Sequence, residues 1–417
     1  MDAIVCGHIC LDLTPTIGGT EKVSLERFFR PGTLNMVEGI EVSPGGAVSN
    51  TGLALTTLGF DTVLVARSGA DPFADLLSAA VEEHGGHAQL SRRENTRTSY
   101  SIIIAPPGHD RVFLHDPGAN KEFTADDVSD EALAEAKVLH FGYPTVMPRI
   151  YSDGGEELAR LYRRAREAGV VTSLDMALPD PDSEPGHIDW KSFLERVLPE
   201  VDVFFPSFEE IAYMIDRPLY DAAMEKAGTG DIVDVISPEQ LRSLGDKLVE
   251  MGAEVSGIKA GHLGIYMRTG DAAAASGGAH TGGADTGGGV TQGFERMARA
   301  GGIDPAAWSN RELFVPSFEV KQVASATGAG DASIAGVLAA IIRGEGPEQA
   351  LRIGSASGAS ACMTYDPTGK LEDYDKLSAA IDAGWRVNEA PGFAEAGFHF
   401  NEGAGVWIGP SDREHKA

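Results

Sequence analysis

Ser325-Ala326-Thr327-Gly328-Ala329-Gly330-Asp331 stands directly before an apolar, helix-patterned run from Ile334 to Ile342. A turn of small residues that opens onto a helix leaves backbone N–H groups unpaired at one point, where the helix dipole also favours negative charge. Because glycine has no Cβ, a phosphate can approach Gly328 and Gly330 closely. The stretch therefore predicts an anion-binding loop with a carboxylate, Asp331, beside it.

Asp331 has two interpretations at this point. It is either a base that takes part in phosphoryl transfer or a residue that caps a buried helix. The rest of the chain has to decide, since a short motif needs its structural context. The chain has no GxxxxGK[ST] sequence and no GxGxxG after a strand, so two common nucleotide-binding motifs are excluded.

The charge balance limits the partners that the protein can have. The chain has 417 residues, with 34 Lys and Arg against 62 Asp and Glu, which gives a formal net charge of −28. This charge argues against general binding to nucleic acids or to anionic membranes. With 42% hydrophobic residues, the chain can bury the core of one large domain or of two.

The cysteines and the N-terminus indicate a reducing compartment. Cys6, Cys10 and Cys362 are too few for a disulfide scaffold and lack the spacing of a structural zinc site. Cys6, His8 and Cys10 could share one face of a strand as metal ligands, but we favour an ordinary half-buried strand. The first residues have neither a basic region nor a long apolar run, so we expect a cytoplasmic protein.

Short β-rich runs alternate with amphipathic helical patterns along the chain, which predicts a mostly parallel sheet covered on both faces. Ligands of such folds bind beyond the carboxyl ends of the strands. The expected strands are Ala3–Cys6, Thr62–Ala66, Val138–Phe141, Val170–Leu174, Val201–Phe205 and Val255–Lys259. The expected helices are Pro72–Glu83, Glu156–Ala168, Ile188–Leu198, Phe208–Ile215 and Pro238–Gly252.

Several segments break this alternation. Two strand-like runs, 99–105 and 111–115, flank a Pro- and Gly-containing turn and predict a hairpin, while 13–43 is irregular and turn-rich. Together they predict a small β lid from about 13–44 and 92–119. We expect a Gly-rich flexible insertion at about 270–302, a loop insertion at 221–236 and a C-terminal tail at 396–417.

Two motifs at opposite ends of the chain carry a family resemblance. Gly45-Gly46-Ala47-Val48-Ser49-Asn50 continues to Leu58-Gly59, and Gly328-Ala329-Gly330-Asp331 follows near the C-terminus. Weaker matches in the expected order are Gly7–Asp12, Gly69–Phe73, Asp116–Asn120 and Lys259–Gly261. From about Met1 to Trp385 the chain resembles the ribokinase-like (PfkB) carbohydrate kinase family. The resemblance implies a kinase domain over 1–395, built as a three-layer αβα sandwich with a small β-sheet lid.

The resemblance also implies an ATP-dependent transfer of the γ-phosphoryl group to a hydroxyl of a sugar or a sugar-like substrate. Such a transfer needs an acceptor held in line and stabilisation of the phosphoryl oxygens. Asp331 would act as the general base, and the amides of Gly328, Ala329 and Gly330 would form the anion hole. The alternative is a noncatalytic sensor that binds a sugar or a nucleoside on the same fold.

For the acceptor, the resemblance points to Asp12, Gly45, Gly46 and Asn50. A carboxylate accepts hydrogen bonds from adjacent hydroxyls, and an amide can donate and accept. Two structural alternatives remain open here, because Asp12 could cap a loop and Asn50 could be the N-cap of a helix over 51–58. The lid would close over the sugar and exclude water.

For the nucleotide, the resemblance implies contacts from Ser207, Lys259, Gly261 and Gly264. Glu210 would orient a hydrated Mg²⁺ through water, which suits an ion that keeps several waters. Ser207 stands where the family usually has Asn, and Glu210 could instead be a solvated acid in the first turn of a helix.

Other positions bear on cations, specificity and assembly. Ser325 replaces an Asp that helps to hold a monovalent cation in the family, so activation by potassium is doubtful. Ala47 stands where ribokinases tend to have Lys. At this position the chain is therefore more similar to fructokinase or ketodeoxygluconate kinase members than to ribokinases. Arg97 and Arg111 could clamp a substrate carboxylate or phosphate, although solvated strand-edge charges are the better interpretation. A homodimer through the lid could use the apolar side chains of Ile102, Ile104, Val112 and Leu114, unless these pack inward.

Overall fold

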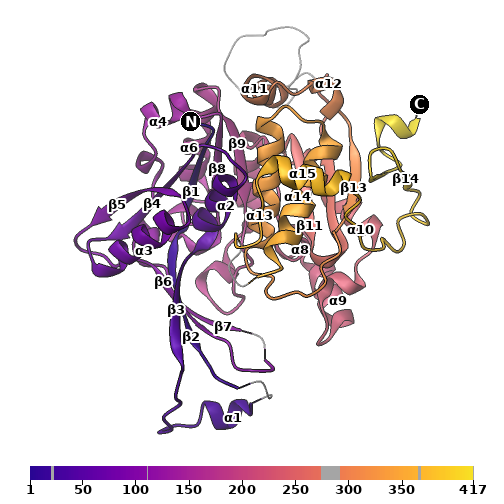
Figure 1. The fold of residues 1–417 in the computed structure, drawn as a ribbon. Helices are drawn as coiled ribbons and strands as arrows, with labels where there is room; N and C mark the ends of the chain where they lie inside the picture. The colour runs from indigo at the N-terminus through magenta and orange to yellow at the C-terminus, as the bar shows by residue number, and fades with distance from the viewer. Residues whose placement is uncertain (20–22, 110, 274–291, 365–367, 417) are drawn as a thin grey trace.

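The computed structural model describes residues 1–19, 23–109, 111–273, 292–364 and 368–416. One large sheet has the strand order β14-β15-β13-β12-β11-β10-β9-β8-β1-β4-β5 (Figure 1). Neighbouring strands are parallel from β5 to β11 and antiparallel from β11 to β14, so the expected mostly parallel sheet is confirmed. The strands are β1 (Ala3–Gly7), β4 (Thr62–Gly69), β5 (His87–Arg93), β8 (Val138–Gly142), β9 (Val171–Asp175), β10 (Val203–Phe204), β11 (Val255–Ala260), β12 (Gly264–Thr269), β13 (Glu312–Pro316), β14 (His399–Asn401) and β15 (Val406–Ile408).

Helices cover both faces of this sheet. Successive residues of β1 point to opposite faces, so Ala3 and Val5 join one apolar cluster while Ile4 and Cys6 join another. The first cluster includes side chains of α2 (Gly46–Thr57), α3 (Pro72–Glu83), α11 (Gln292–Gly301), α13 (Ala329–Ile342), α14 (Pro347–Ala361) and α15 (Tyr374–Asp382). The second includes side chains of α6 (Glu156–Glu167), α7 (Trp190–Val197), α8 (Phe208–Ile215) and α10 (Pro238–Glu250). The three-layer architecture is therefore confirmed. No described helix has both the length and the apolar composition needed to cross a bilayer.

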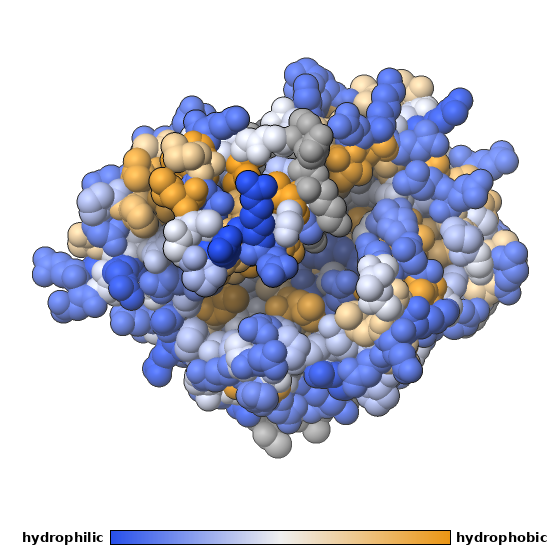
Figure 2. Space-filling view, turned by 90° about the horizontal axis from the view of Figure 1, so that it is seen from below, coloured by the Kyte–Doolittle hydropathy of each residue, from blue (hydrophilic) through white to orange (hydrophobic). Residues whose placement is uncertain are grey.

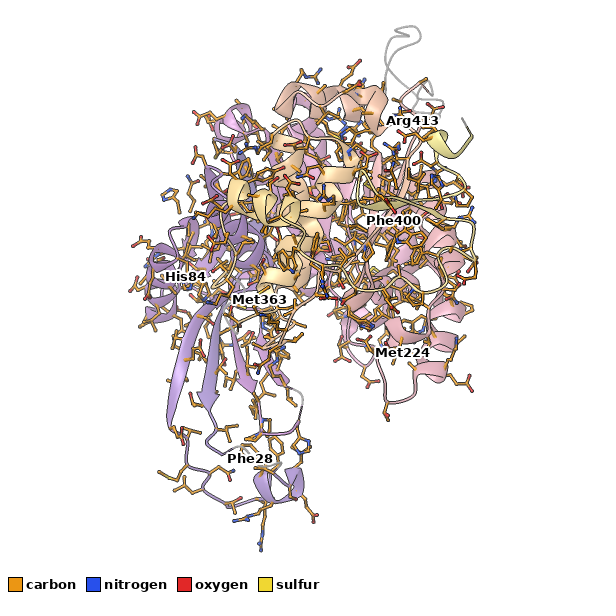
Figure 3. The ribbon with its side chains drawn as sticks, turned by 45° about the vertical axis from the view of Figure 1, so that its right-hand side comes forward. Phe28, His84, Met224, Met363, Phe400 and Arg413 are labelled. Carbon is orange, nitrogen blue, oxygen red and sulfur yellow. The ribbon has the colours of Figure 1, made fainter. Side chains whose placement is uncertain are left out.

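A second sheet forms the lid, which extends away from the body (Figure 1). Its strands are β2 (Cys10–Thr16), β3 (Gly39–Gly45), β6 (Tyr100–Ile104) and β7 (Val112–Asp116), in the order β3-β2-β6-β7. The short helix α1 (Leu25–Phe28) ends the lid, and Figure 3 shows Phe28 far from the body. The expected β6–β7 hairpin is confirmed. The segment 13–43 is less irregular than expected, because β2 and β3 pair antiparallel despite Pro15 and Pro44.

The Gly-rich insertion is shorter than the sequence suggests. Residues 274–291 lie outside the described part of the chain, but 292–301 form helix α11, so the expected lack of structure is wrong there. Phe294 and Met297 of α11 pack in the core, and the Arg296 guanidinium donates to the buried Asp202 carboxylate, with Nε and Oδ2 at 3.0 Å. The Gly-rich composition of the whole segment did not reveal this helix, because only one face of the helix is apolar.

Two further segments differ from the expectations. The presumed loop at 221–236 contains most of α9 (Arg217–Ala227) and a 3₁₀ helix, Ile232–Val235. Instead of forming only a tail, 396–417 adds β14 and β15 to the main sheet, and Asp412 accepts a hydrogen bond from the buried Arg311 at 3.0 Å. The sequence analysis did not foresee β12 and β13 either. The remaining short helices are α4 (Asp130–Glu135), α5 (Pro148–Tyr151) and α12 (Pro305–Trp308).

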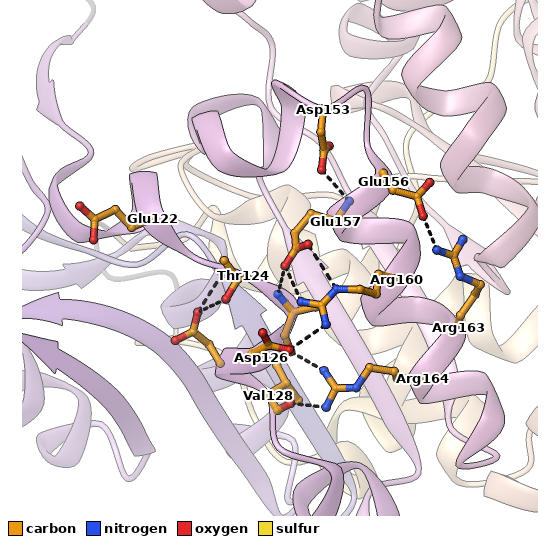
Figure 4. Close-up of polar contacts among 12 residues, drawn as sticks. Glu122, Thr124, Asp126, Val128, Asp153, Glu156, Glu157, Arg160, Arg163 and Arg164 are labelled. Atoms are coloured by element: carbon orange, nitrogen blue, oxygen red, sulfur yellow. Dashed lines mark hydrogen bonds and ion pairs between the residues drawn. The ribbon is translucent and has the colours of Figure 1, made fainter.

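Polar contacts attach the outer face of α6 to the turn before α4 (Figure 4). The Arg160 guanidinium pairs with Asp126 and Glu157, each at 2.7 Å, and Glu157 also accepts from the N–H of Ala125 at 2.8 Å. Exposed pairs of this kind contribute about 0–1 kcal/mol each. These pairs therefore position α6 against the turn before α4, while the apolar clusters provide most of the stability of the fold.

Candidate active site

A cavity of about 780 Å³ lies at the carboxyl ends of the parallel strands, against the N-terminus of α13. Figure 2 views the molecule from the lid end and shows a hollow near the middle of this face. The position agrees with the ligand site expected for a parallel sheet. Residues predicted from the sequence that line the cavity are Ser207, Glu210, Lys259, Gly261, Gly264, Gly328, Ala329, Gly330 and Asp331.

Helix α13 starts at the predicted anion-binding loop. Gly328 is its N-cap, with a φ of 75° that favours glycine. The N–H groups of Gly330 and Asp331 stand in the first turn, where a helix offers them no acceptor of its own. The N–H of Ala329 already donates to the Ala326 carbonyl at 3.3 Å, so an anion would have to share this donor. Asp331 makes no capping hydrogen bond, and the helix-cap interpretation is therefore wrong.

The Asp331 carboxylate joins distant parts of the chain. It is only 2% exposed, and its Oδ2 accepts from the Asn50 amide at 3.0 Å and from the Tyr143 hydroxyl at 2.9 Å. The Thr51 hydroxyl donates more weakly to Oδ1, at 3.4 Å. Asp331 thus lies between the cavity and the N-terminal part of α2.

Helix α2 starts earlier than the sequence suggests. Its N-cap is Gly45 and its first residue is Gly46, so Asn50 lies inside the helix and the N-cap interpretation is wrong. A Cβ on Gly45 would lie 2.2 Å from Oδ2 of Asp12, and one on Gly46 would lie 2.6 Å from Nδ1 of His8. Gly46 also has a φ of 83° and would clash with the His8 carbonyl oxygen at 2.7 Å, so this position requires glycine, whereas a larger residue at Gly45 would have to displace the Asp12 side chain.

Asp12 lies on the lid side of the same region. It belongs to β2, where it is paired with Ser43, so the loop-capping interpretation is also wrong. Its Oδ1 accepts from the Cys10 thiol at 3.3 Å. Burial raises the pKa of Asp12, and this effect outweighs the hydrogen bonds from Cys10 and Ser101 and the charge of Arg111.

A buried ion pair lies beside the anion-binding loop. The Lys259 ammonium is 2.8 Å from Oδ1 of Asp175, at the ends of β11 and β9. A Cβ on Gly330 would lie 3.2 Å from the same ammonium, so the positive charge lies next to the first turn of α13. Burial opposes the charge of Lys259, but Asp175 and Glu210 raise its pKa overall.

The charges around Asp331 determine its protonation. Burial and the nearby Asp175 carboxylate raise the pKa of Asp331 to about 6, although Lys259 and the hydrogen bonds from Asn50 and Tyr143 act in the opposite direction. The carboxylate is therefore mostly ionised at neutral pH and close to the range in which a general base works well.

Ser207 and Glu210 form a capping box at the start of α8. The Ser207 hydroxyl accepts from the N–H of Glu210 at 3.2 Å, and Oε2 of Glu210 accepts from the N–H of Ser207 at 2.6 Å. Glu210 is thus a first-turn acid, but it is half-buried and lines the cavity instead of being solvated. Burial and, to a smaller extent, Asp175 raise its pKa to about 8, while Lys259 acts to lower it.

Two glycines shape the part of the cavity wall that follows β11. Gly261 and Gly264 have φ values of 50° and 134°, which favour glycine. A Cβ on Gly264 would lie 2.0 Å from the carbonyl oxygen of Val315, so β12 and β13 could not pair as they do with a larger residue there. Both glycines line the cavity.

The two arginines near the lid behave differently. Arg97 is 78% exposed and pairs with Asp116 at 3.4 Å, as expected of a solvated charge, although it lies in the loop before β6 and not on a strand. Arg111 instead donates to the Ser325 hydroxyl at 3.1 Å, so the strand-edge interpretation is wrong for it. Arg111 connects the lid to the loop that precedes α13.

The sequence analysis missed Tyr143, Asp175 and Thr51. Tyr143 follows β8 with a φ of 62°, which is unusual for a residue other than glycine, and Asp175 ends β9. Both strands were predicted, so searching their carboxyl ends for polar side chains would have found these two residues. Thr51 had no comparable signal, since its contact depends on the packing of α2 against α13.

Comparison with known proteins agrees with this architecture. The probable fructokinase-3 of Arabidopsis thaliana is 24% identical over 218 residues, which cover 52% of this chain and 59% of that protein. The chain thus spans less than two thirds of that relative. An uncharacterized sugar kinase of Archaeoglobus fulgidus is 22% identical over 313 residues, or 75% of this chain and 96% of that protein.

Solved structures share the fold. The structure of Arabidopsis thaliana ribokinase complexed with ribose and ATP matches with a TM-score of 0.62 and 16% identity, over 91% of this chain and 97% of that one. The family described as pfkB family carbohydrate kinase matches residues 6–276 and 300–373. The two motifs that carry the resemblance, Gly45–Asn50 and Gly328–Asp331, both fall within these ranges. The chain therefore belongs to the pfkB family of carbohydrate kinases.

Proposed function

We propose that the protein transfers the γ-phosphoryl group of ATP to a hydroxyl of a sugar or a sugar-like acceptor, with Asp331 as the general base. The observation that carries this proposal is the Asp331 carboxylate, which is buried in the first turn of α13 and held by Asn50 and Tyr143. Membership of the pfkB family supports the reaction class.

In the proposed step, an acceptor oxygen attacks the γ-phosphorus as its proton passes to the Asp331 carboxylate. The new O–P bond forms while the bond between the γ-phosphorus and the β–γ bridging oxygen breaks, and ADP leaves. The N–H groups of Gly330 and Asp331 and the Lys259 ammonium would stabilise the charge on the phosphoryl oxygens. The N–H groups of Gly328 and Ala329 would complete the anion hole, with the Ala329 N–H shared between the Ala326 carbonyl and a phosphoryl oxygen.

The acceptor would lie between the lid and α2. Asp12 would accept hydrogen bonds from its hydroxyls, Asn50 would orient it, and Gly45 and Gly46 would allow close approach of the backbone. The half-buried position of Asp12 and the contact of Asn50 with Asp331 support this arrangement. The fructokinases among the relatives favour a sugar without selecting one.

The 780 Å³ cavity would hold the nucleotide. Ser207, Lys259, Gly261 and Gly264 would line its binding site. Glu210 fits a hydrated Mg²⁺, because this ion prefers oxygen ligands and keeps several waters. When bound, Mg²⁺ would neutralise part of the phosphate charge. The contact of Arg111 with Ser325 already brings a positive charge to the position where the family resemblance implied a monovalent cation, so we expect equal rates in potassium and choline chloride.

The test is ADP release from Mg-ATP with a panel of hexoses, pentoses, sugar acids, sugar phosphates and nucleosides. We expect release above the background hydrolysis with at least one sugar, and formation of the phosphorylated sugar in equal amount. Saturable binding of a sugar or a nucleoside and of ATP, without ADP release from any acceptor, would favour the noncatalytic sensor.

We also propose that two copies pair through their lids. Strand β6 pairs with β7 so that Ile102 lies opposite Leu114 and Ile104 opposite Val112, which puts these four side chains on one face of the lid sheet. His115 lies on the other face, toward His8. Sedimentation velocity should give a dimer for the wild type and a monomer for Leu114→Glu, while Leu76→Glu on α3 should stay dimeric. A monomeric wild type would contradict the proposal.

A further inference from the structure

Three side chains that can bind metals converge where the lid joins the body. His8 follows β1, Cys10 is the first residue of β2, and His115 lies in β7. One donor atom of each residue lies within 4.8 Å of the donor atoms of the other two. The Nε2 atoms of His8 and His115 are only 3.1 Å apart.

The grouping differs from the one considered from the sequence. Cys6 was weighed there as a partner of His8 and Cys10, but its side chain lies in the apolar cluster on the far face of β1. The third member is His115, which is 107 residues away from His8 and comes from the lid. Only the folded chain brings these three residues together.

The two imidazoles have lone pairs available for a cation. His8 is buried, whereas His115 is exposed to solvent. Nδ1 of His8 is buried and has no hydrogen-bond partner among the described residues. Two imidazole rings with facing nitrogens at 3.1 Å either form an N–H···N hydrogen bond or hold a cation between them.

The surrounding contacts resemble the second shell of a metal site. Nδ1 of His115 lies 3.1 Å from the Ser101 hydroxyl, which leaves Nε2 directed at His8. Metal-binding histidines commonly use their second nitrogen in this way. The Cys10 thiol lies 3.3 Å from Oδ1 of Asp12, so a carboxylate is available next to the three ligands.

We propose that His8, Cys10 and His115 bind a divalent transition cation of the zinc class, with water as a fourth ligand. Two imidazoles and a thiolate suit such a cation, whereas Mg²⁺ prefers oxygen ligands. Tetrahedral coordination places donor atoms about 3.3–3.6 Å apart. The Cys10 thiol would therefore have to move only slightly toward the two imidazole nitrogens. Binding releases the thiol proton to solvent and joins lid strand β7 to the body.

The test is a titration of the full-length, tag-free chain with Co²⁺ in the presence of excess Mg²⁺. We expect one equivalent to produce a thiolate-to-cobalt absorption band in the near ultraviolet and tetrahedral bands in the visible, all of which Zn²⁺ displaces. Cys10→Ser should abolish the thiolate band. His115→Ala should weaken binding by more than about 100-fold, and Ser101→Ala by about 10–100-fold, because loss of an outer-shell partner alone has that effect.

Matched variants separate this site from nonspecific binding. Cys362→Ser and the exposed His87→Ala should leave the titration unchanged. Circular dichroism and the melting temperature of each variant without metal check that it folds. The proposal is overturned if folded wild type gives no thiolate band at one equivalent of Co²⁺, or if folded Cys10→Ser and His115→Ala bind Co²⁺ as tightly as the wild type does.

Discussion

The floor of the cavity and the lid above it are built in opposite ways. The floor contains buried charges that are paired or hydrogen-bonded, as in the 2.8 Å contact between Lys259 and Asp175 and the contacts of Asp331 with Asn50 and Tyr143. The lid exposes apolar side chains, and Val112, Phe113 and Leu114 are 47%, 50% and 53% exposed.

The difference has a physical cause. A buried charge without a partner costs several kcal/mol, so the folded chain must fix the geometry of the floor before any ligand arrives. Exposed apolar side chains gain about 25 cal/mol per Å² when they are covered, so the lid is stabilised by contact with a ligand or with another surface. This contrast agrees with the proposed function, in which the floor carries the chemistry and the lid encloses the acceptor.

The largest effect should come from the floor. Asp331→Asn keeps the shape of the side chain but removes the base, so kcat should fall about 10²–10⁴-fold. The melting temperature should change little. The control is Asp382→Asn, at an exposed acid on α15, which should have wild-type kcat. A kcat within threefold of the wild type in Asp331→Asn would refute the role of Asp331.

The ion pair of the floor should matter for stability as well as for the proposed phosphoryl transfer. Lys259→Met leaves Asp175 buried without a partner, which should cost about 3–5 kcal/mol in the free energy of unfolding measured with urea. Lys247→Met breaks a more exposed pair with Asp216 and should cost less than about 1 kcal/mol. Adding Asp175→Asn to Lys259→Met should recover part of the loss. Equal losses in the two lysine variants would remove the contrast between floor and surface.

The contact between lid and floor should have an intermediate effect. Arg111→Ala removes the hydrogen bond to Ser325, which we expect to lower kcat/KM for the acceptor about tenfold, in line with the strength of hydrogen bonds from charged groups. Arg97→Ala, which removes the exposed arginine near the lid, should change kcat/KM for the acceptor by less than about twofold. If both variants behave alike, Arg111 does not connect the lid to the reaction.

The smallest effect should be a shift in pH dependence. The Tyr143 hydroxyl helps to keep the pKa of Asp331 down, so Tyr143→Phe should raise that pKa. The pH–rate profile should move to higher pH, with a greater loss of rate at pH 6 than at pH 8. Tyr213→Phe, whose hydroxyl contacts the Gly186 carbonyl at 3.2 Å, serves as the control. A profile that moves to lower pH in Tyr143→Phe would contradict the assigned hydrogen bond.

The sequence predicted the buried parallel strands and capped helices of the body better than strands β2 and β3 of the lid. Buried parallel strands such as β1 and β8 are short apolar runs, and helices such as α3 and α8 carry a clear N-cap and an apolar face, so their limits could be recognised. Strands β2 and β3 contain prolines and polar residues, and their pairing depends on contacts between segments about 30 residues apart.

The residues of the candidate site divide in the same way, into those that a local motif reveals and those that only the folded chain reveals. Asp331, Lys259 and Glu210 were found because they stand in or next to short motifs with a physical meaning. Thr51 reaches Asp331 through a tertiary contact that no local pattern records, and the contact of Arg111 with Ser325 was not foreseen either, although Arg111 itself was named as a candidate. Long-range convergence of this kind is what the structure adds.

The most direct test of the central claim is the pH dependence of phosphoryl transfer in a single turnover. With enzyme in excess over ATP and with a saturating accepted sugar, the wild-type rate should rise with pH through a midpoint of about 6, the pKa of Asp331. In Asp331→Asn the residual rate should lack this midpoint. A wild-type rate that is flat from pH 5 to pH 8, or a midpoint near 6 that persists in Asp331→Asn, would contradict the assignment of Asp331 as the base.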